Sequence, residues 1–362
     1  MLYRVIGLMS GSSLDGLDIA FVEFLETAGK WSYEIKIAET LSYEKEWSDK
    51  LQSAPQLSAR DYLLLHAQYG HYTGKLVQSF IDKHRLHYQV QLIASHGHTS
   101  FHLPGMGMTA QLGDGAAIAA ETGIITISDL RAMDVAHGGQ GAPIVPISEK
   151  LLWSQYALFL NIGGIANCSY TNGAEYRAMD CCPANRVLNM LANREGRAYD
   201  DGGEMAASGQ LHQGLLAALN EQSYYRQPAP KSLANEFGTN VLFPLIQSFG
   251  ISTADALHTY CEHIAIQVAA SVQHLKGTDT QPGQLLITGG GALNAFLIKK
   301  LQDRLAEINV TVVLPDAATI HFKEAIAMAL IGTLRWREEI NVLQSVTGAA
   351  KDSVGGAIWG VS

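Results

Sequence analysis

The segment Tyr3–Phe24, YRVIGLMSGSSLDGLDIAFVEF, joins two apolar runs through a turn of glycine, serine and aspartate. Apolar runs that flank a turn of this composition predict a β-hairpin. Its tip, Ser10–Ser13, offers hydroxyls and unhindered backbone N–H groups, which are donors that suit a phosphate group. The hairpin is therefore a candidate phosphate-binding loop, and an ordinary tight hairpin is the alternative.

A P-loop is excluded at this position. The spacing Gly11-x4-Gly16 matches the first half of that motif, but Leu17 and Asp18 stand where it requires Lys and then Ser or Thr. The net charge of the chain is −9, so a phosphate site here would rely on backbone amides, Mg²⁺ and a few cations.

Length and composition indicate a globular protein of two lobes. The chain has 362 residues, of which 47% are hydrophobic and 16% charged, which is enough apolar material for sizeable cores. The negative net charge argues against nucleic acid or an anionic membrane as the main partner. Four cysteines without C-x-x-C spacing indicate a reducing compartment. No signal-peptide pattern and no uninterrupted apolar run of about 20 residues are found, so we expect a cytoplasmic protein.

A second hairpin repeats the form of the first. Ala157–Asn161 predicts a strand, Ile162–Ile165 a turn that contains Gly163 and Gly164, and Ala166–Tyr170 a return strand. Two such hairpins about 150 residues apart predict a duplicated lobe, with two phosphate-facing loops across a cleft. Asp180 follows a short predicted strand just past the repeat, which makes it a candidate general base.

Two further loops are candidates for ligand contact. Gly289–Gly291 follows the predicted strand Gln284–Thr288 and precedes a helix, which favours close approach to a nucleotide, although a full G-x-G-x-x-G is absent. Tyr88–Ala94 predicts a strand that ends at Ser95–His102, where three histidines are spaced H-x-H-x3-H. Polar contacts to a ligand are favoured over zinc, because the cluster has no Cys, Asp or Glu. Glu324 begins a predicted helix, so a favourable interaction with the helix dipole is its alternative role.

The ordered series of motifs resembles the anhydro-N-acetylmuramic acid kinase family of the actin, sugar-kinase and Hsp70 ATPase superfamily. Each motif is short, but the series runs nearly from end to end of the chain. The motifs are Met9–Gly16, Ser95–Gly97, Gln111–Asp114, Gly138–Pro143, Asn161–Asn167, Gly289–Gly291 with Asn294, Glu324–Ala325 and Ser345–Ala349.

The resemblance implies an α/β, two-lobed actin-like ATPase fold with duplicated ribonuclease H-like lobes and a central ATP cleft. Lobe I would comprise residues 1–130 and 341–362, and lobe II residues 131–340. The implied reaction uses ATP to open 1,6-anhydro-N-acetylmuramic acid hydrolytically and to phosphorylate O6, giving N-acetylmuramic acid 6-phosphate. ATP and Mg²⁺ are the implied cofactors, with the Mg²⁺ ligands unidentified, and a homodimer is implied.

The resemblance also implies roles for residues. Asp180 would be the catalytic aspartate, because it opens the segment that matches the family's D-T-G-P-G-N motif. Sugar contacts would fall on His96, Gly97, Arg131 and Glu324. ATP and phosphate contacts would fall on Gly11, Ser12, Ser13, Leu14, Asp15, Gly16, Leu17, Asp18, Gly163, Gly164, Gly289, Gly290, Gly291 and Asn294.

Three departures from the family pattern bear on activity. The D-T-G-P-G-N motif reads D-C-C-P-A-N at Asp180–Asn185, and side chains in place of glycines would keep a loop farther from phosphate. The P-K-S-T-G-R-E motif reads P-K-S-L-A-N-E at Pro230–Glu236, which loses an arginine that could meet a phosphate or carboxylate. His98 stands where Gln is usual.

The departures leave three interpretations open: the same activity in a divergent subgroup, a kinase for a different amino sugar, or an inactive nucleotide-binding module. The retention of Asp180, Arg131 and Glu324 favours an enzyme.

Overall fold

The chain forms two compact units. The computed structural model describes residues 1–11, 14–173, 175–228, 231–234 and 236–360. Unit 1 comprises Met1–Ser154 and Phe322–Ser362, and unit 2 comprises Gln155–His321. We expected boundaries at residues 130 and 340, but residues 131–154 and 322–340 lie in unit 1. Buried polar contacts within unit 1, described below, hold both segments there.

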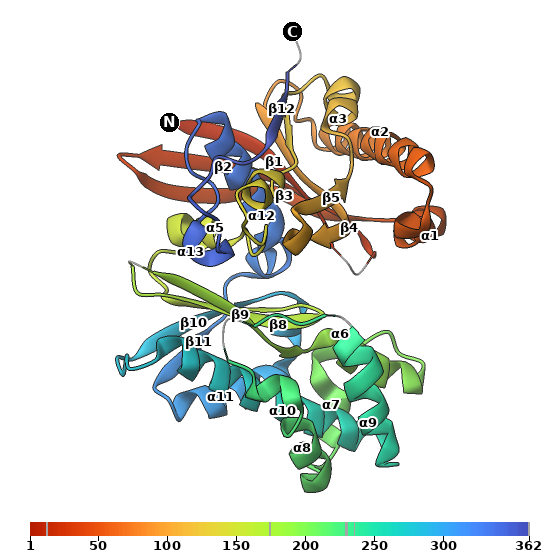
Figure 1. The fold of residues 1–362 in the computed structure, drawn as a ribbon, viewed down its shortest axis with the longest axis vertical. Helices are drawn as coiled ribbons and strands as arrows, with labels where there is room; N and C mark the ends of the chain where they lie inside the picture. The colour runs from red at the N-terminus through yellow and green to blue at the C-terminus, as the bar shows by residue number, and fades with distance from the viewer. Residues whose placement is uncertain (12–13, 174, 229–230, 235, 361–362) are drawn as a thin grey trace. The chain divides into compact units, whose positions relative to one another are not determined.

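Unit 1 is built on a mixed sheet whose strand order is β12-β6-β4-β1-β2-β3, with β5 paired to β4 (Figure 1). β1 and β2 are antiparallel, with Ser10 opposite Leu17, and this pairing confirms the predicted hairpin. β4 runs parallel to β1. The strands are β1 Leu2–Ser10, β2 Gly16–Thr27, β3 Lys30–Ser42, β4 Leu92–Leu103, β5 Met108–Leu112, β6 Thr126–Ser128 and β12 Ala357–Trp359.

β4 differs from the strand that we expected. The prediction was a strand over Tyr88–Ala94 that delivers the histidines beyond its end, whereas the observed strand continues through them to Leu103. β5 pairs with this second half, from His98 opposite Leu112 to Leu103 opposite Met108, and so keeps the chain extended.

Helices cover both faces of the sheet in unit 1. Ile6 and Leu8 of β1 share a core with Val77 and Phe80 of α2. Side chains alternate along a strand, so Gly7 faces the opposite side, where α12 packs. The helices of unit 1 are α1 Lys45–Ser53, α2 Ala59–His84, α3 Gly115–Thr122, α4 Ala132–Ala136, α5 Pro146–Leu152 and α13 Gln344–Thr347, together with the part of α12 (Ala317–Trp336) from Phe322 onward.

The contact between β1 and α12 is too close for a side chain at position 7. A Cβ on Gly7 would lie 1.9 Å from the Ala325 carbonyl oxygen. Farther along the helix, a Cβ on Gly332 would lie 2.4 Å from the Cβ of Ala94 on β4. α12 is long and apolar enough to cross a membrane by length and composition, but 72% of its apolar window is buried. These contacts make it a core helix of unit 1.

Unit 2 repeats the order of five strands of the unit 1 sheet. Its sheet runs β11-β10-β7-β8-β9, with β8 antiparallel to β7 and β9, and β10 parallel to β7 and β11. These strands correspond in order and direction to β6, β4, β1, β2 and β3 of unit 1. The predicted α/β class and the predicted duplication are therefore confirmed. The strands are β7 Leu158–Ile162, β8 Ile165–Thr171, β9 Tyr176–Pro183, β10 Gly283–Thr288 and β11 Val310–Val313.

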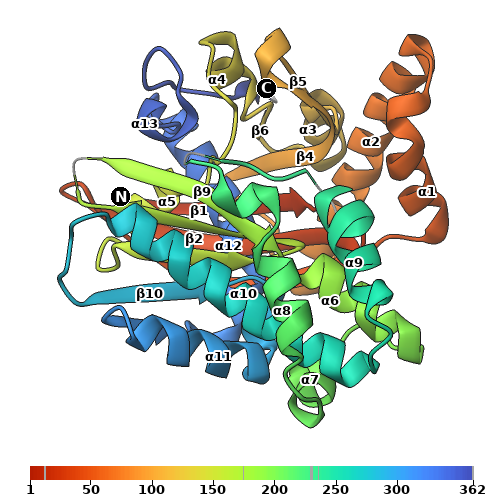
Figure 2. The same ribbon diagram turned by 60° about the horizontal axis from the view of Figure 1, so that its bottom comes forward.

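The longest helix of unit 2 supplies much of its core. α10 lies beside α11 (Figure 2), and its Tyr260 and Cys261 are buried in the core cluster of the unit. This burial confirms the predicted core helix over Ala254–Leu275. The helices of unit 2 are α6 Asn185–Ala192, α7 Glu204–Ser208, α8 Gln213–Asn220, α9 Phe243–Ser248, α10 Thr253–Lys276 and α11 Ala295–Ala306, with a π-helical turn at Phe237–Leu242.

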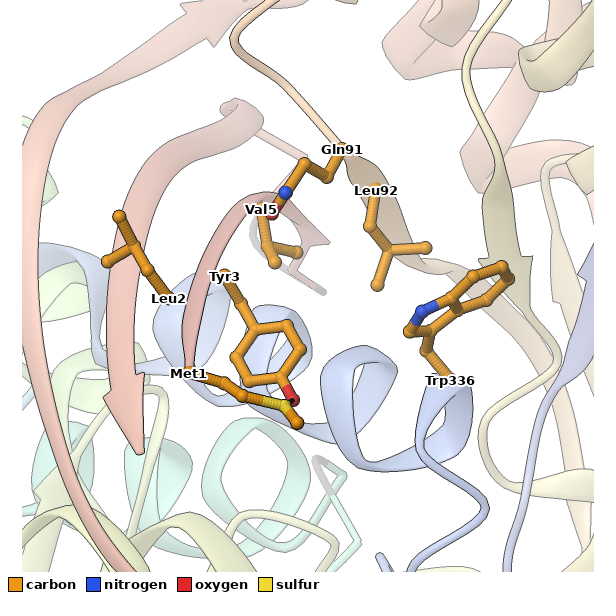
Figure 3. A pocket seen from close by; sticks show the side chains of 7 residues that line it. All are labelled: Met1, Leu2, Tyr3, Val5, Gln91, Leu92 and Trp336. Carbon is orange, nitrogen blue, oxygen red and sulfur yellow. Dashed lines mark hydrogen bonds between the residues drawn. The ribbon is translucent and has the colours of Figure 1, made fainter. Parts of the chain in front are cut away.

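Unit 1 has a small pocket at the start of β1. It has a volume of about 360 Å³ and mostly apolar walls (Figure 3). Ser10 ends the same strand about 25 Å away, at about 3.3 Å per residue. The pocket is therefore separate from the predicted phosphate loop. Its lining residues are Met1, Leu2, Tyr3, Val5, Gln91, Leu92 and Trp336.

A buried ion pair joins α12 to α5, and its loss should destabilise unit 1. Lys323 Nζ lies 2.6 Å from Glu149 Oε1, with side chains only 5% and 6% exposed. Lys323→Met would leave a buried carboxylate without this cation, so we expect the free energy of unfolding to fall by about 3–5 kcal/mol in urea denaturation. Adding Glu149→Gln should recover most of that loss.

The exposed pair between Lys45 and Asp49 provides the control. Lys45→Met should cost no more than about 0.5 kcal/mol, because exposed pairs contribute little. A Lys323→Met variant as stable as this control would contradict the assignment.

Candidate functional site

Three of the residues expected to contact a sugar are joined in unit 1. His96 Nδ1 donates to the Gly97 carbonyl at 2.8 Å, and Arg131 Nε donates to His96 Nε2 at 2.8 Å. Burial, together with the positive charge of Arg131, lowers the pKa of His96 to about 3, so the ring is neutral. Gly97 has φ +73°, and a Cβ there would lie 2.4 Å from the Leu112 carbonyl oxygen. The backbone at this position therefore requires glycine.

The fourth residue, Glu324, completes the cluster electrostatically. Burial lowers the pKa of Arg131 to about 10, and the negative charge of Glu324 opposes that shift. Burial likewise raises the pKa of Glu324, opposed by Arg131 and Lys323. Glu324 is the eighth residue of α12 and lies beyond its first turn, so the expected dipole interaction does not explain it. The sugar cluster, defined as His96, Gly97, Arg131 and Glu324, thus combines a cation, a carboxylate and a neutral imidazole.

A buried aspartate that we did not single out supports this cluster. Asp134, fully buried, accepts hydrogen bonds from Gly141 N at 2.7 Å and from Thr347 Oγ1 at 2.6 Å. The Gly141 carbonyl in turn accepts from Arg131 Nη1. Asp134 therefore ties the Gly138–Pro143 and Ser345–Ala349 motifs together beneath Arg131. Its position in the same short segment as Arg131, after β6, was the available signal.

A chain of hydroxyl groups holds the base of the first hairpin. Ser10 Oγ lies 3.1 Å from His98 Nδ1 and accepts from Tyr43 Oη at 2.8 Å, and Tyr43 is bonded to the hydroxyl of Tyr69. Burial lowers the pKa of His98 to about 4, so this ring is also neutral. His98 therefore anchors Ser10. Among the described residues, no group of three His, Cys, Asp or Glu side chains could hold a metal ion.

The predicted phosphate hairpin is described in part. Ser12 and Ser13 lie outside the described residues. The side chain of Leu17 is buried in the core, so only its backbone could face a ligand. A Cβ on Gly16 would lie 2.6 Å from the Leu41 carbonyl oxygen, so the packing of β2 on β3 requires glycine there. Gly11 and Leu14 are partly exposed, and Asp15 is exposed.

Asp18 carries an unfavourable charge in unit 1. Burial is the main cause that raises the pKa of its carboxyl to about 6, and the negative charges of Asp15 and Glu324 raise it further. A hydrogen bond from Thr40 Oγ1 at 2.6 Å offsets part of the shift. A carboxylate kept near like charges in a partly buried position would gain from a nearby cation.

Unit 2 holds the candidate base. Asp180 Oδ2 accepts from the backbone N–H of Leu233 at 2.7 Å, and Asp180 N donates to the Lys231 carbonyl at 3.0 Å. Tyr224 Oη donates to the Asp180 carbonyl at 2.7 Å. Burial raises the pKa of Asp180, and the Leu233 N–H opposes the shift. A fixed carboxylate with a raised pKa is suited to accept a proton.

The substituted side chains after Asp180 point into the core. Cys181, Cys182 and Ala184 are all buried in the core cluster of unit 2. The β8–β9 ladder shifts register between Ala166 and Asn167, so Cys181 is the extra residue of a β-bulge. The bulge lets Cys181 and Cys182 both face the core. We expected these substitutions to hold the loop away from phosphate, but their side chains fill the interior instead.

The two glycine-rich loops of unit 2 lie together. A Cβ on Gly289 would lie 2.6 Å from Asn161 Oδ1, and one on Gly291 would lie 2.2 Å from Ile162 Cγ2. These two glycines are required by packing against the β7–β8 turn. At Gly290 the nearest atom to an added Cβ is Asn185 Nδ2, at 3.6 Å, so the space there is open. Asn294 Oδ1 accepts from Leu297 N at 2.9 Å and caps α11, which is a structural use of that side chain.

The charge of Asp18 gives a pH-dependent prediction. The folded pKa of about 6 exceeds the ordinary 3.8, so the charged form costs stability that is absent in acid and complete above pH 6. Asp18→Asn should therefore raise the free energy of unfolding by about 1–3 kcal/mol near neutral pH and by little near pH 4. Urea denaturation at both pH values measures the difference.

Asp49→Asn, at an exposed position, is the control and should change stability little at either pH. An Asp18→Asn variant that is no more stable than the native protein near neutral pH would refute a desolvated charge at this position.

Comparisons with known proteins show the family of the chain. The family model described as anhydro-N-acetylmuramic acid kinase matches residues 3–360. A protein of that name from Synechococcus elongatus is 34% identical, covering 98% of this chain and 99% of that protein. Another, from Hydrogenovibrio crunogenus, is 33% identical, covering 98% and 97%. A third, from Vibrio parahaemolyticus, is 32% identical, covering 96% and 95%.

Likeness to solved structures is weaker. The activator of the 2-hydroxyisocaproyl-CoA dehydratase from Clostridium difficile, with bound ADPNP, is 14% identical, with a TM-score of 0.48, and the match covers 92% of this chain and 96% of that one. That similarity is too low to support an argument. The family model and the full-length relatives are sufficient: this chain is a member of the anhydro-N-acetylmuramic acid kinase family.

Proposed function

We propose that the protein uses ATP to open the internal ether of 1,6-anhydro-N-acetylmuramic acid with water and to phosphorylate O6, acting as a cytoplasmic homodimer on small-molecule substrates. Family membership over nearly the whole chain supports the kinase activity. The observation that carries the mechanism is the carboxylate of Asp180, fixed by the Leu233 N–H and with its pKa raised by burial.

The substrate sets the role of the base. In a 1,6-anhydro sugar, O6 is an ether oxygen with no proton, so Asp180 acts on water. Asp180 accepts a proton from a water molecule, the water oxygen bonds to C1, and the C1–O6 bond breaks. O6 leaves with the bonding electron pair and takes the γ-phosphoryl group from ATP, so ADP is released. Phosphoryl transfer then depends mainly on positioning and on stabilisation of charge.

The sugar cluster would bind the acceptor. The Arg131 guanidinium suits a carboxylate or ring oxygen, and neutral His96 with Glu324 suits hydroxyl groups. Because Arg131 is held by the Gly141 carbonyl and by His96, it presents a fixed geometry to the sugar. Fixed contacts of this kind lower the entropic cost of aligning the reacting atoms.

The glycine loops would bind ATP, through Gly11–Asp18 of the first hairpin in unit 1, and through Gly163, Gly164 and Gly289–Gly291 with Asn294 in unit 2. Kinases hold Mg²⁺ through one or two carboxylates plus the phosphates of the nucleotide, and the ion neutralises phosphate charge. β1 cannot supply an acid at position 7 or 8, because Gly7 contacts α12 and Leu8 is in the core. Asp18 fits the requirement, because a cation would relieve its repulsion from Asp15 and Glu324.

The alternatives are a kinase for another amino sugar and an inactive nucleotide-binding module. Four of the departures that raised these alternatives leave Asp180 in place: Cys181, Cys182 and Ala184 are core residues, and Leu233 binds Asp180 through its backbone. Asn235, where the family has an arginine, lies outside the described residues. No observation favours either alternative over the kinase of the family name.

Removal of the basic oxygen should stop the reaction while binding persists. Asp180→Asn retains an oxygen that can accept from Leu233 N, but it cannot accept a proton from water. We expect turnover, followed as ADP release with Mg-ATP and the anhydro sugar, to fall by about 10²-fold or more. Calorimetry should show that ATP and the sugar still bind.

Isotope labelling tests the same step independently. In heavy-oxygen water, the native enzyme should place the label at C1 of the product and not in the new phosphate. Near-normal turnover by Asp180→Asn, or label in the phosphate of the sugar product, would eliminate this mechanism.

Nucleotide binding at the open glycine gives a further prediction. Gly290→Val adds a side chain where unit 2 leaves space, so we expect a normal melting temperature and a dissociation constant for ATP raised by about 10-fold or more. Gly105→Val is the matched control, because an added Cβ at Gly105 meets nothing within 4 Å. Calorimetry in which both variants bind ATP like the native protein would remove Gly290 from the nucleotide site.

A further inference from the structure

An arginine at the start of α6 is left without a partner in unit 2. Arg186 is the second residue of that helix, and its Nε is buried with no hydrogen-bond partner. Among the described residues, no hydrogen bond or ion pair to the Arg186 guanidinium is found. Arg186 as a whole is partly exposed, so an anion could reach its guanidinium, a charged donor group without a partner among the described residues.

The position of Arg186 on its helix is also unfavourable. A cation in the first turn faces the positive end of the helix dipole, which disfavours it. No acidic residue lies in that first turn to offset the charge. The first backbone N–H groups are already used: those of Ala184 and Arg186 donate to the Gly164 carbonyl, and that of Asn185 donates to the Gly163 carbonyl. The guanidinium is thus the donor that remains for an anion.

The surroundings of Arg186 leave room for such a ligand. Added Cβ atoms on Gly163, Gly164 and Gly290 would meet no atom closer than 3.6 Å, and none of these glycines has a positive φ. Neither packing nor backbone conformation within unit 2 therefore requires glycine at these positions. An added Cβ on Gly164 would contact Arg186 Nε itself at 3.8 Å. The three glycines keep the space beside the guanidinium uncovered.

We propose that Arg186 is a phosphate-binding residue, whose guanidinium takes oxygens of the nucleotide phosphates over the Gly163–Gly164 turn. This inference rests on the proposed use of ATP and adds a residue that sequence reasoning missed. The charge of a phosphate offsets the unfavourable helix-dipole interaction, and its oxygens accept hydrogen bonds from the guanidinium. The available signal was a cation directly after the retained Asn185 of the catalytic motif.

Nucleotide binding by Arg186→Met tests the proposal. Arg194→Met, on the 3₁₀ turn that follows α6, is the matched control, because it removes the same charge from the same unit at an exposed position. We expect Arg186→Met to raise the dissociation constant for ADP by about 10-fold or more, since hydrogen bonds to charged groups contribute about 1.5–3 kcal/mol. Adenosine and the anhydro sugar should bind as they do to the native protein, and Arg194→Met should bind all three normally.

Stability supplies a second readout. Without ligand, Arg186→Met should melt no lower than the native protein, because it removes an unsatisfied charge from an unfavourable end of a helix. A lower melting temperature without ligand would indicate a structural role and overturn the proposal. Unchanged ADP affinity would overturn it, as would an equal loss of adenosine affinity or a selective loss of sugar affinity. Absence of ADP binding by the native protein would refute the proposed use of ATP, and with it this inference, whereas the other outcomes refute only the role of Arg186.

Discussion

The close approach of α12 to β1 is the constraint on which unit 1 depends. With the Ala325 carbonyl oxygen 1.9 Å from where a Cβ of Gly7 would be, the helix lies directly on the strand. That contact fixes the height of Glu324 above the sheet, and the buried pair between Lys323 and Glu149 fixes the helix against α5. It also prevents β1 from carrying an acidic residue at position 7, because there is no room for a side chain there. Leu8, the next residue, packs in the core on the opposite face of the sheet. The strand that ends at the predicted phosphate hairpin therefore contributes backbone and Ser10, and the two candidate site acids of unit 1, Asp18 and Glu324, lie on β2 and α12.

Each unit, taken by itself, holds candidate site charges in positions where they are costly. Burial raises the pKa of Asp18, Glu324 and Asp180, and lowers that of Arg131. Three of these groups are held in place by neighbours that do not neutralise them fully: Thr40 for Asp18, the Leu233 N–H for Asp180, and His96 with the Gly141 carbonyl for Arg131. Such arrangements are typical of sites whose charges are balanced by ligands, because the folded protein alone gains nothing from them. The polar network beneath Arg131, centred on Asp134, holds the cluster rigid at the same time.

Sequence reasoning reached most of the fold because both hairpins carry strong local signals. Turn residues flanked by apolar runs identified β1–β2 and β7–β8, and the repetition of that form identified the duplication. It misplaced the strand ends, helix ends and unit boundaries that depend on contacts between residues distant in sequence. β4 continues through its histidines because β5 pairs with it, and α12 begins seven residues before Glu324. The unit boundaries shifted because Asp134 binds Thr347, and Glu149 binds Lys323, across long stretches of chain. The candidate site residues were predicted from motifs along the sequence, whereas Asp134 and Tyr43 were not singled out, because their contacts depend on neighbours distant in sequence.

The hydrogen bond from Leu233 to Asp180 has a consequence for how such proteins diverge. The donor is a backbone N–H, so the residue that carries it can change without altering the carboxylate. The bulge at Cys181 also permits substitution. It turns the side chains after Asp180 into the core, so these residues are constrained by core packing. The sequences of two motifs, Asp180–Asn185 and Pro230–Glu236, can therefore change while the position of the Asp180 carboxylate is preserved. A survey that judges family membership by side-chain identity in these loops would class such relatives as inactive. A survey that asks whether the aspartate, the proline and the backbone path are retained would include them in the family.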